Sequence, residues 1–405
     1  MNGKCQEWNG GLKNIGMFNN NKKMNLKIKE YQKHNSFHEF HVTNGQTDID
    51  EQIRRSIKIL EEESNIQENW KQVLLQVKND LKLENKTNTH LNISPFVADE
   101  MQCIIDKEIP KYLYHRYRYE IYPKIKRLDE FPPYLQIEPS SICNYRCTFC
   151  YQTDQSFSKK KSEHMGVMSI DLFKQIIDQI EGKIEFISMA SRGEPLICKD
   201  FDKMMEYSIG KFLNLKVNTN ASLLTEKMCH ALLCGGAKTI VFSADAAEEN
   251  LYSKLRVRGK LKNVLKNIER FKNIREREYK NFPLITRVSG VYVDNEQNMS
   301  DMKNLWGELV DQVCFVKYHP LENIYESPFS NIDEPCSELW RRMFVWQDGS
   351  VNPCESDFKS NLKVGNIDQE DLTQIWLGDK YKLLRNEHIR QKRNEIHPCN
   401  RCVYL

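Results

Sequence analysis

The sequence lacks the features of a membrane protein, a secreted protein or a strongly charged one. No apolar run approaches the ~18 residues that a membrane-spanning helix needs, and the N-terminus has no apolar signal-peptide core. The net charge of +3 is too small to indicate nucleic-acid binding by itself. No segment repeats along the chain. We therefore expect neither a membrane nor a nucleic acid among the partners.

What the chain contains is the composition of an ordinary globular protein, with one exception. Its 405 residues are enough for two or three domains with a sizeable core. Charged residues make up 28% and apolar residues 40%, as in soluble proteins. The exception is thirteen cysteines, which gather in two places, and this favours metal sites over disulfides. Free thiols that bind metal persist where the environment is reducing, so we expect a cytoplasmic setting.

The first group of cysteines has the spacing C-x3-C-x2-C and consists of Cys143, Cys147 and Cys150. It follows residues 134–139, which are typical of a short buried strand, so the cysteines fall on a loop of the kind that carries chemistry in α/β folds. Three thiolates suit a [4Fe-4S] cluster with one iron left open for a small-molecule ligand. A structural zinc site is the alternative, although such sites use four ligands, usually in paired C-x2-C elements.

At this loop the sequence resembles the radical S-adenosylmethionine (SAM) enzymes, and the resemblance extends from about Pro132 to the C-terminus. Residues 138–144 are similar to the family's lead-in, and Phe149 matches a position that packs on the adenine in that family. The resemblance implies that the three cysteines bind a [4Fe-4S] cluster. It also implies that the amino and carboxylate groups of the methionine moiety bind the open iron.

From residue 134 onward, apolar strand-like and helix-like segments alternate, which indicates an α/β fold with a parallel sheet and right-handed crossovers. The pattern alone does not separate a partial barrel from a doubly wound sheet, whereas the resemblance implies a partial (β/α)6 barrel of the TIM type. The expected strands are 134–139, 184–190, 215–218, 239–244, 284–293 and 312–318, and the expected helices are 169–181, 199–212, 225–233, 247–277 and 296–310.

We expect three domains: an N-terminal tail and helical extension over 1–95, a radical SAM core with a helical lead-in over 96–325, and an iron–sulfur domain over 326–405. Residues 1–25 have the composition of a poorly ordered tail.

Within the extension, apolar stripes over 48–60 and 66–81 predict a helical hairpin, capped by Thr47 or Asp48, with a linker over 84–94. This extension is either packing or a module that recruits a substrate or partner. The Tyr-rich segment 112–120 mixes aromatic and basic residues as some nucleic-acid surfaces do, but we interpret it as a helix that packs aromatics on the barrel.

The segment after the second expected strand, Ser-Arg-Gly-Glu-Pro at 191–195, matches the family's GGEP-type motif with Arg192 in place of the first glycine. Gly193 would let the backbone approach the ligand, and Glu194 would accept a hydrogen bond from the methionine amino group. An ordinary turn is the alternative.

The resemblance also implies that residues near the ends of the next strands contact the ribose and the methionine carboxylate. Arg258 competes with Arg256 as the carboxylate partner, which a bidentate guanidinium suits, and a cap or a surface ion pair is the alternative for each residue. The expected contacts are Asn218, Ser243, Asp245 and Arg256.

The second group of cysteines consists of Cys336, Cys354, Cys399 and Cys402, with an Asp-Gly hairpin turn within residues 346–353. An all-thiolate zinc ribbon is one interpretation. In a chain that resembles radical SAM enzymes, the closer resemblance is to the auxiliary-cluster domains of the SPASM and twitch type. Because the longer SPASM pattern continues past this point, we expect a twitch-like domain with one fully ligated auxiliary [4Fe-4S] cluster.

The resemblance implies an enzyme that reductively cleaves SAM to a 5′-deoxyadenosyl radical, which abstracts a substrate hydrogen, with a reductant such as flavodoxin or ferredoxin as partner. Twitch relatives include dehydrogenases of amino-cyclitols and sugars, so the first hypothesis is oxidation or rearrangement of a sugar-like small molecule. The second is modification of a peptide or protein side chain, with residues 1–95 binding a leader peptide. The third is a non-catalytic iron–sulfur protein.

The fifth and sixth expected strands would line the substrate side of a barrel, opposite the cysteine loop. Arg287 and Ser289 share one face by the period of two, and Lys317, Tyr318 and His319 lie together at the end of the sixth strand. Dehydrogenation needs a proton acceptor, so we predict catalytic roles for Arg287, Tyr318 and His319. Alternatively, Arg287 pairs with a core carboxylate and His319 caps the strand.

Overall fold

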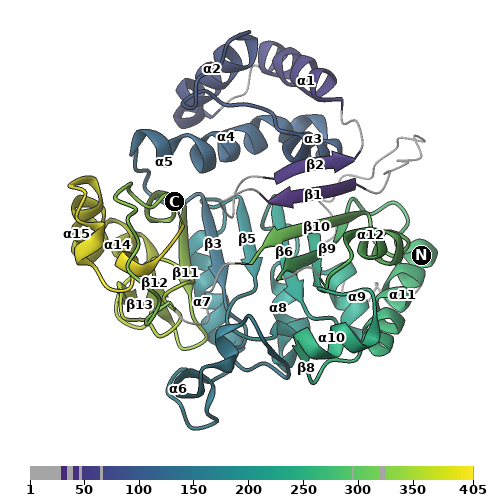
Figure 1. Ribbon diagram of the computed structural model, residues 1–405. Helices are drawn as coiled ribbons and strands as arrows, with labels where there is room; N and C mark the ends of the chain where they lie inside the picture. Colours follow the sequence, from purple (N-terminus) through teal and green to yellow (C-terminus); the bar gives the residue numbers. More distant parts are fainter. Residues whose placement is uncertain are drawn as a thin grey trace.

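The computed structural model describes residues 29–33, 40–44, 48–63, 67–293, 296–318 and 324–404. Its centre is an eleven-stranded sheet in the order β13-β12-β11-β3-β5-β6-β7-β9-β10-β1-β2 (Figure 1). All six expected strands are present in its middle, joined by parallel ladders: β3 (Tyr134–Ile137), β5 (Phe186–Met189), β6 (Asn214–Thr219), β7 (Ala237–Ser243), β9 (Ile285–Tyr292) and β10 (Gln312–Lys317). The predicted α/β fold with a largely parallel sheet is confirmed.

Two further parallel strands extend this sheet, and the sequence pattern did not predict either of them. β1 (Lys29–Lys33) pairs with β10, and β11 (Arg342–Val345) pairs with β3, so segments from both ends of the chain join the barrel sheet. The margins are antiparallel, formed by β2 (Phe40–Asn44), β12 (Ser350–Asn352) and β13 (Gly365–Asn366). The expected poorly ordered tail, 1–25, lies outside the described residues.

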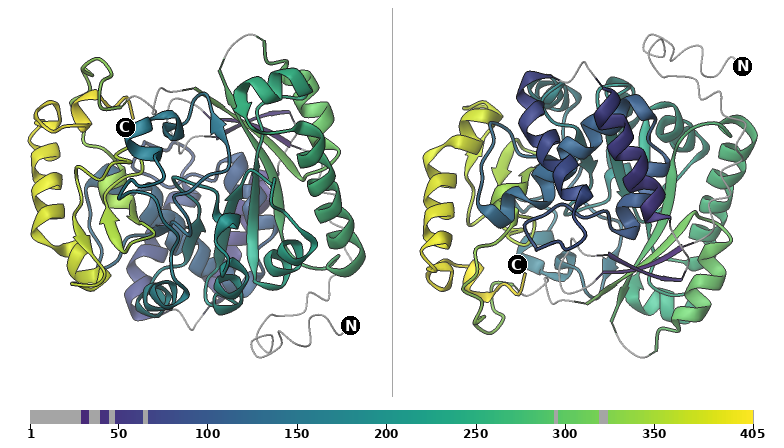
Figure 2. Two further views of the ribbon diagram at one scale, coloured as in Figure 1. Left: turned by 90° about the horizontal axis from the view of Figure 1, so that it is seen from below. Right: turned by 90° about the horizontal axis from the view of Figure 1, so that it is seen from above.

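The outer face of the sheet is covered by the crossover helices (Figure 2). The apolar stripe of α7 is buried against the sheet, and its first turn is capped by Ser169, whose hydroxyl accepts from the Leu172 N–H. Strands buried on both faces and amphipathic helices together give the layered core that the alternation predicts. The helices are α7 (Ile170–Ile180), α8 (Phe201–Tyr207), α9 (Glu226–Cys234), α10 (Glu249–Leu255), α11 (Leu261–Glu278) and α12 (Met299–Gly307).

The single helix expected over 247–277 is wrong, because it is interrupted between α10 and α11. There β8 (Arg256–Val257) pairs antiparallel with β4 (Arg146–Cys147) of the cysteine loop. Arg258 has a φ of 76°, and a Cβ at Gly259 would lie 2.8 Å from the Arg256 carbonyl oxygen. A helix cannot continue through such a backbone, and the break places Arg256 beside the cysteines.

The N-terminal helices form two layers over the amino-terminal ends of the strands (Figure 1). The predicted hairpin is confirmed as α1 (Ile49–Glu62) and α2 (Glu68–Lys82), with Asp48 capping α1. Beneath it lie α3 (Pro95–Gln102), α4 (Ile109–Glu120) and α5 (Tyr122–Ile125). The Tyr-rich helix α4 packs on the barrel as expected, since ring centroids of Tyr112 and Phe186 are 6.0 Å apart and those of Tyr119 and Tyr134 are 5.9 Å apart.

The C-terminal segment packs beside β3 through β11 and the expected Asp-Gly hairpin, in which Gly349 has a φ of 78°. Asp371 caps the helical segment that follows, which breaks at Gly378 into α14 (Leu372–Leu377) and α15 (Asp379–Ile389). Because this segment shares a sheet with the barrel, the boundary at 325/326 stays a prediction. In the part of the chain that the structure describes, no helix has the length and apolar character to cross a bilayer.

Candidate active site

A cavity of about 440 Å³ runs through the inside of the sheet. The cysteine loop, residues 143–150, lines one end, and α3 and α4 line the other. In Figure 1, β8, which pairs with the cysteine loop, lies below the strands, and α3 and α4 lie above them. The carboxyl ends of the strands therefore meet the cysteine loop, as barrel enzymes arrange their sites.

The three loop thiols, Cys143, Cys147 and Cys150, all line this cavity. The Tyr145 N–H lies 3.4 Å from the Cys143 sulfur, and the Gln152 N–H lies 3.5 Å from the Cys150 sulfur. Burial raises the pKa of the Cys143 thiol to about 12, and it raises the pKa of the other two thiols as well. Three buried soft donors with backbone N–H groups beside them fit an iron–sulfur cluster, because bound iron keeps thiolates deprotonated.

Beside the loop, Glu194 is buried and accepts three hydrogen bonds, from the Thr219 hydroxyl (2.6 Å), the Asn220 N–H (2.8 Å) and the Leu196 N–H (3.2 Å). Burial raises the pKa of its carboxyl to about 6 despite these donors. A Cβ at Gly193 would lie 2.4 Å from the Ser140 carbonyl oxygen, so the backbone there passes too close for any other residue. The motif therefore presents a fixed carboxylate at the cavity wall, which suits an ammonium ligand.

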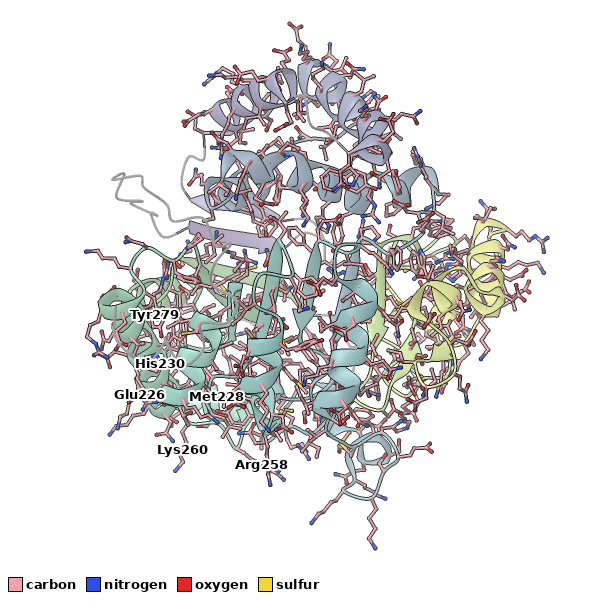
Figure 3. The ribbon with its side chains drawn as sticks, turned by 180° about the vertical axis from the view of Figure 1, so that it is seen from behind. Glu226, Met228, His230, Arg258, Lys260 and Tyr279 are labelled. Atoms are coloured by element: carbon pink, nitrogen blue, oxygen red, sulfur yellow. The ribbon has the colours of Figure 1, made fainter. Side chains whose placement is uncertain are left out.

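Arg256, rather than Arg258, faces the cavity. Its guanidinium is buried, its Nε lies 2.5 Å from the Asp245 carboxylate, and its Nη1 lies 4.0 Å from the Cys147 sulfur. The Arg258 side chain is exposed and points away from the molecule (Figure 3). Asp245 does not line the cavity, because Arg256 and the Val291 N–H occupy its carboxylate. Asp245 thus fits the positioning of Arg256 better than a direct cofactor contact.

The other proposed SAM contacts lie where the sequence placed them. Phe149, Asn218 and Ser243 line the cavity, and the ring centroid of Phe149 is 5.9 Å from the Arg256 guanidinium carbon. Within the described residues, the side-chain oxygen of Asn218 is buried without a hydrogen-bond partner. An orphaned acceptor in a site of this kind suits a hydroxyl ligand such as a ribose. Their roles as SAM contacts stay predictions.

The predicted catalytic residues are only partly brought together. Arg287 and Ser289 line the cavity, and the Arg287 guanidinium donates twice to the Gln312 side-chain oxygen, at 2.9 and 2.7 Å. Tyr318 does not line the cavity. His319 and the side chain of Lys317 lie outside the described part of the structure. The proton-acceptor role of Tyr318 and His319 therefore stays a prediction.

Sequence reasoning missed several charged residues at the end of the cavity away from the cysteine loop. Lys216 of β6 could have been found by alternation, because it lies two residues before Asn218. Arg342 could not, since nothing in the pattern indicated that its strand joins β3. The remaining missed members are Glu100, Arg116, Tyr119 and Glu355.

The second group of thiols gathers at the C-terminus. Burial raises the pKa of Cys336 to about 11 and the pKa of Cys354, Cys399 and Cys402 as well, and the other thiols of the group add to this effect on Cys354 and Cys399. The buried Arg393 guanidinium next to them donates to the carbonyl oxygens of Cys399 (3.4 Å) and Cys402 (3.1 Å). Four buried thiols that raise one another's pKa, beside a buried cation, supply the donor type of a second, fully ligated cluster.

Comparison with known proteins agrees with both clusters. Residues 137–305 match the radical SAM superfamily, and residues 336–403 match an iron–sulfur cluster-binding domain called SPASM, so that more than half of the chain is matched. The iron–sulfur match argues against the zinc interpretation of the C-terminal cysteines.

Three relatives illustrate the range of similar proteins. A GTP 3′,8-cyclase of Clostridium botulinum (strain Okra / Type B1) is 27% identical over 215 residues, 51% of this chain and 63% of the cyclase, so the match spans less than two thirds of that enzyme. An S-adenosyl-L-methionine-dependent 2-deoxy-scyllo-inosamine dehydrogenase of Niallia circulans is 23% identical over 280 residues, 68% of this chain and 94% of the dehydrogenase.

Among solved structures, Streptococcus suis SuiB bound to its precursor peptide SuiA is similar in fold, with a TM-score of 0.53 and 16% identity over 85% of each chain. The matched domains, the loop thiols and the fold agree with one another. The chain belongs to the radical SAM superfamily and carries a C-terminal SPASM-type iron–sulfur domain, which implies SAM and [4Fe-4S] clusters as cofactors.

Proposed function

We propose that the enzyme oxidises or rearranges a sugar-like small molecule inside the cavity. The observation that carries this proposal is the lining of the end away from the cysteine loop. It combines aromatic rings, Tyr119 and Tyr134, with amide groups, Gln136 and Asn214. Rings that pack on C–H faces and amides that pair with hydroxyls are what a polyol needs for binding. The likeness to an amino-cyclitol dehydrogenase, over 94% of that enzyme, supports the same class.

Oxidation of a CH–OH group removes one hydrogen atom, one proton and one electron from the substrate. When bound, the reduced loop cluster and SAM supply a 5′-deoxyadenosyl radical for the hydrogen atom, and an auxiliary cluster supplies an electron acceptor. The chain's own residues orient the reactants: Glu194 and Arg256 would bind the charged ends of the methionine moiety, and Asp245 would fix the Arg256 side chain. A flavodoxin or ferredoxin would serve as reductant.

The experiment is an anaerobic assay of the reconstituted enzyme with SAM, a reductant and a panel of sugars, amino-cyclitols and peptides. We expect a product that has lost two hydrogens, or an isomer, from the sugar-like group, formed together with 5′-deoxyadenosine. Modified peptides with unchanged sugars would contradict the proposal and favour peptide modification; the structurally similar SuiB has been solved bound to a precursor peptide. Clusters without any SAM cleavage would favour a non-catalytic protein.

A further inference from the structure

β6 directs three polar side chains into the cavity. Asn214, Lys216 and Asn218 line it, and they alternate with Leu215 and Val217, which are buried on the other face. Within the described residues, the side-chain oxygens of both asparagines are buried without a hydrogen-bond partner. Three side chains that fill one strand face with unused polar groups indicate a ligand rather than a packed core.

The Lys216 ammonium is the charged member of this row, and it has no counter-ion in the described part of the chain. Its contact is with the Tyr134 ring, whose centroid lies 6.0 Å from Nζ. The Arg342 guanidinium carbon lies 4.9 Å from the centroid of the same ring, so a second cation lies close by. A half-buried ammonium without a counter-ion is costly, and an arriving anion would remove that cost.

The electrostatic balance around Lys216 is positive. Burial, and then the guanidinium groups of Arg342 and Arg287, lower the pKa of Lys216 to about 8, against smaller opposing effects of Tyr119 and Glu355. Burial lowers the pKa because it penalises the charged form, and the two guanidinium groups lower it by repelling the ammonium. The cations that surround Lys216 therefore outweigh the nearby carboxylate.

The carboxylates that line the cavity already have donors of their own. Glu100 accepts from the Tyr112 hydroxyl at 2.8 Å, and Glu355 accepts from the Gln136 amide at 2.8 Å. Glu194 lies at the opposite end and accepts from backbone N–H groups. Lys216 forms no ion pair with these three carboxylates among the described residues, so an anionic ligand would supply the direct counter-charge that it lacks.

We propose that the end of the cavity away from the cysteine loop binds an anionic group of the substrate, a carboxylate or a phosphate, through Lys216, Arg287 and Arg342. The inference rests on the proposed function and deepens it, because it assigns a negative charge to the sugar-like substrate. The delocalised charge of a guanidinium attracts both kinds of anion, and here the Nε and Nη2 of Arg287 donate to Gln312 while those of Arg342 donate to the Tyr119 hydroxyl, which fixes both groups in place. An anion fixed at the amino ends of the strands leaves the carbon skeleton pointing toward the cysteine loop, where hydrogen abstraction takes place.

The test measures binding to the reconstituted holoenzyme by isothermal titration calorimetry with three matched probes: glucose, glucuronate and glucose 6-phosphate. Wild-type enzyme should bind at least one charged sugar about tenfold or more tightly than glucose, and the stronger of the two identifies a carboxylate or a phosphate site. Lys216→Met should remove this preference and Lys216→Arg should keep it. The matched control is Lys238→Met, because Lys238 is a half-buried lysine of β7 whose pKa burial also lowers, but it lines a separate cavity of about 180 Å³.

The preference should depend on pH in one direction. Bound anion favours protonated Lys216, so binding near pH 8 takes up a proton, and affinity should fall as the pH rises above about 8. Burial keeps the pKa of Tyr119 raised and carboxylates and tyrosines keep the pKa of Arg342 raised, so these neighbours do not titrate there. Arg287 and Glu355 are the remaining charged groups that act on Lys216. In the Lys216→Arg variant, affinity should not fall above pH 8, because arginine stays protonated there.

Each outcome separates this inference from the proposed function. Equal binding of all three sugars by the wild-type enzyme overturns the inference, and oxidation of a neutral sugar would still support the function. Tighter binding of charged sugars without any oxidised or rearranged product supports the inference and contradicts the function. If Lys216→Met binds charged sugars normally, yet forms 5′-deoxyadenosine without product, Lys216 accepts a proton instead and the anion site is wrong.

Discussion

Arg192 replaces the first glycine of the GGEP-type motif, and the structure gives it a structural task with a measurable size. Its side chain donates to both oxygens of Glu138, at 2.8 and 2.6 Å, and to the Phe358 carbonyl oxygen at 2.9 Å. Its guanidinium carbon also lies 4.2 Å from the centroid of the Trp346 ring. The side chains of Arg192 and Glu138 are 2% and 0% exposed, so the pair is fully buried. Arg192 thus links β3 to the C-terminal iron–sulfur segment.

Arg192→Met would remove the two side-chain hydrogen bonds to Glu138 and leave its carboxylate buried. The Arg192 and Gln347 backbone N–H groups, at 3.1 and 3.3 Å, would still contact it, but they carry no net charge. Breaking a buried ion pair on one side costs about 3–5 kcal/mol. At ~1–2 °C per kcal/mol for a chain of this length, Tm should fall by about 3–10 °C.

The assay is anaerobic thermal unfolding of the holoenzyme, followed by circular dichroism, for Arg192→Met, Glu138→Gln and the double variant. The neutral double variant should recover about 2 kcal/mol or more relative to the sum of the single changes, because no charge is left unpaired. Lys203→Met is the control, since its pair with Asp200 is exposed and screened by water, so Tm should stay nearly unchanged. Additive losses within ~0.5 kcal/mol would refute the buried-pair reasoning.

Two further predictions concern the clusters and SAM. The holoenzyme should contain about eight irons, since two [4Fe-4S] clusters account for seven cysteine ligands, and changing the three loop cysteines to Ala should leave about four; zinc without iron in that variant would contradict the auxiliary cluster. Arg256→Lys should weaken SAM binding roughly 10- to 100-fold, because it removes a bidentate fork worth ~1.5–3 kcal/mol while keeping a charge for Asp245. Arg258→Lys is the matched control and should bind SAM normally in equilibrium dialysis. The iron content of both variants checks that they fold. Equal losses of SAM affinity in the two variants would mean that Arg256 does not bind SAM.

The parts of the fold that sequence predicts here are those fixed by local pattern. The loop cysteines are a short motif, and each strand of the barrel is an apolar run between helical stripes, so neither depends on knowing the distant chain. The split of the 247–277 helix was missed because its cause is a pairing between Arg256–Val257 and Arg146–Cys147, over a hundred residues away. The apolar periodicity within residues 247–277 gives no sign of that contact.

Some residues of the candidate site could likewise be predicted from local pattern, and others could not. The residues that follow strand ends, such as Glu194 and Asn218, were found because parallel strands bring their carboxyl ends together. Arg342 was missed because its place depends on β11 pairing with β3, two hundred residues earlier. Asp245 was placed on the cofactor, whereas its carboxylate is taken by Arg256, a pairing that sequence spacing does not encode. Pairings between charged side chains inside a cavity are thus the feature that sequence patterns predict least well.

The N-terminal helices offer the last discrimination between small-molecule and peptide substrates. α3 and α4 line the cavity, and the hairpin of α1 and α2 packs on α4 through Val73, Leu74 and Val77. Deleting 1–90 would uncover that apolar face, so a surface change is the sharper test. Leu75 on α2 is 55% exposed, and an exposed leucine of this kind is what a leader peptide would contact. Leu75→Ser should leave substrate turnover and SAM cleavage unchanged if the substrate is a small sugar. Loss of turnover with intact SAM cleavage and an unchanged Tm would instead favour a peptide that docks on α2.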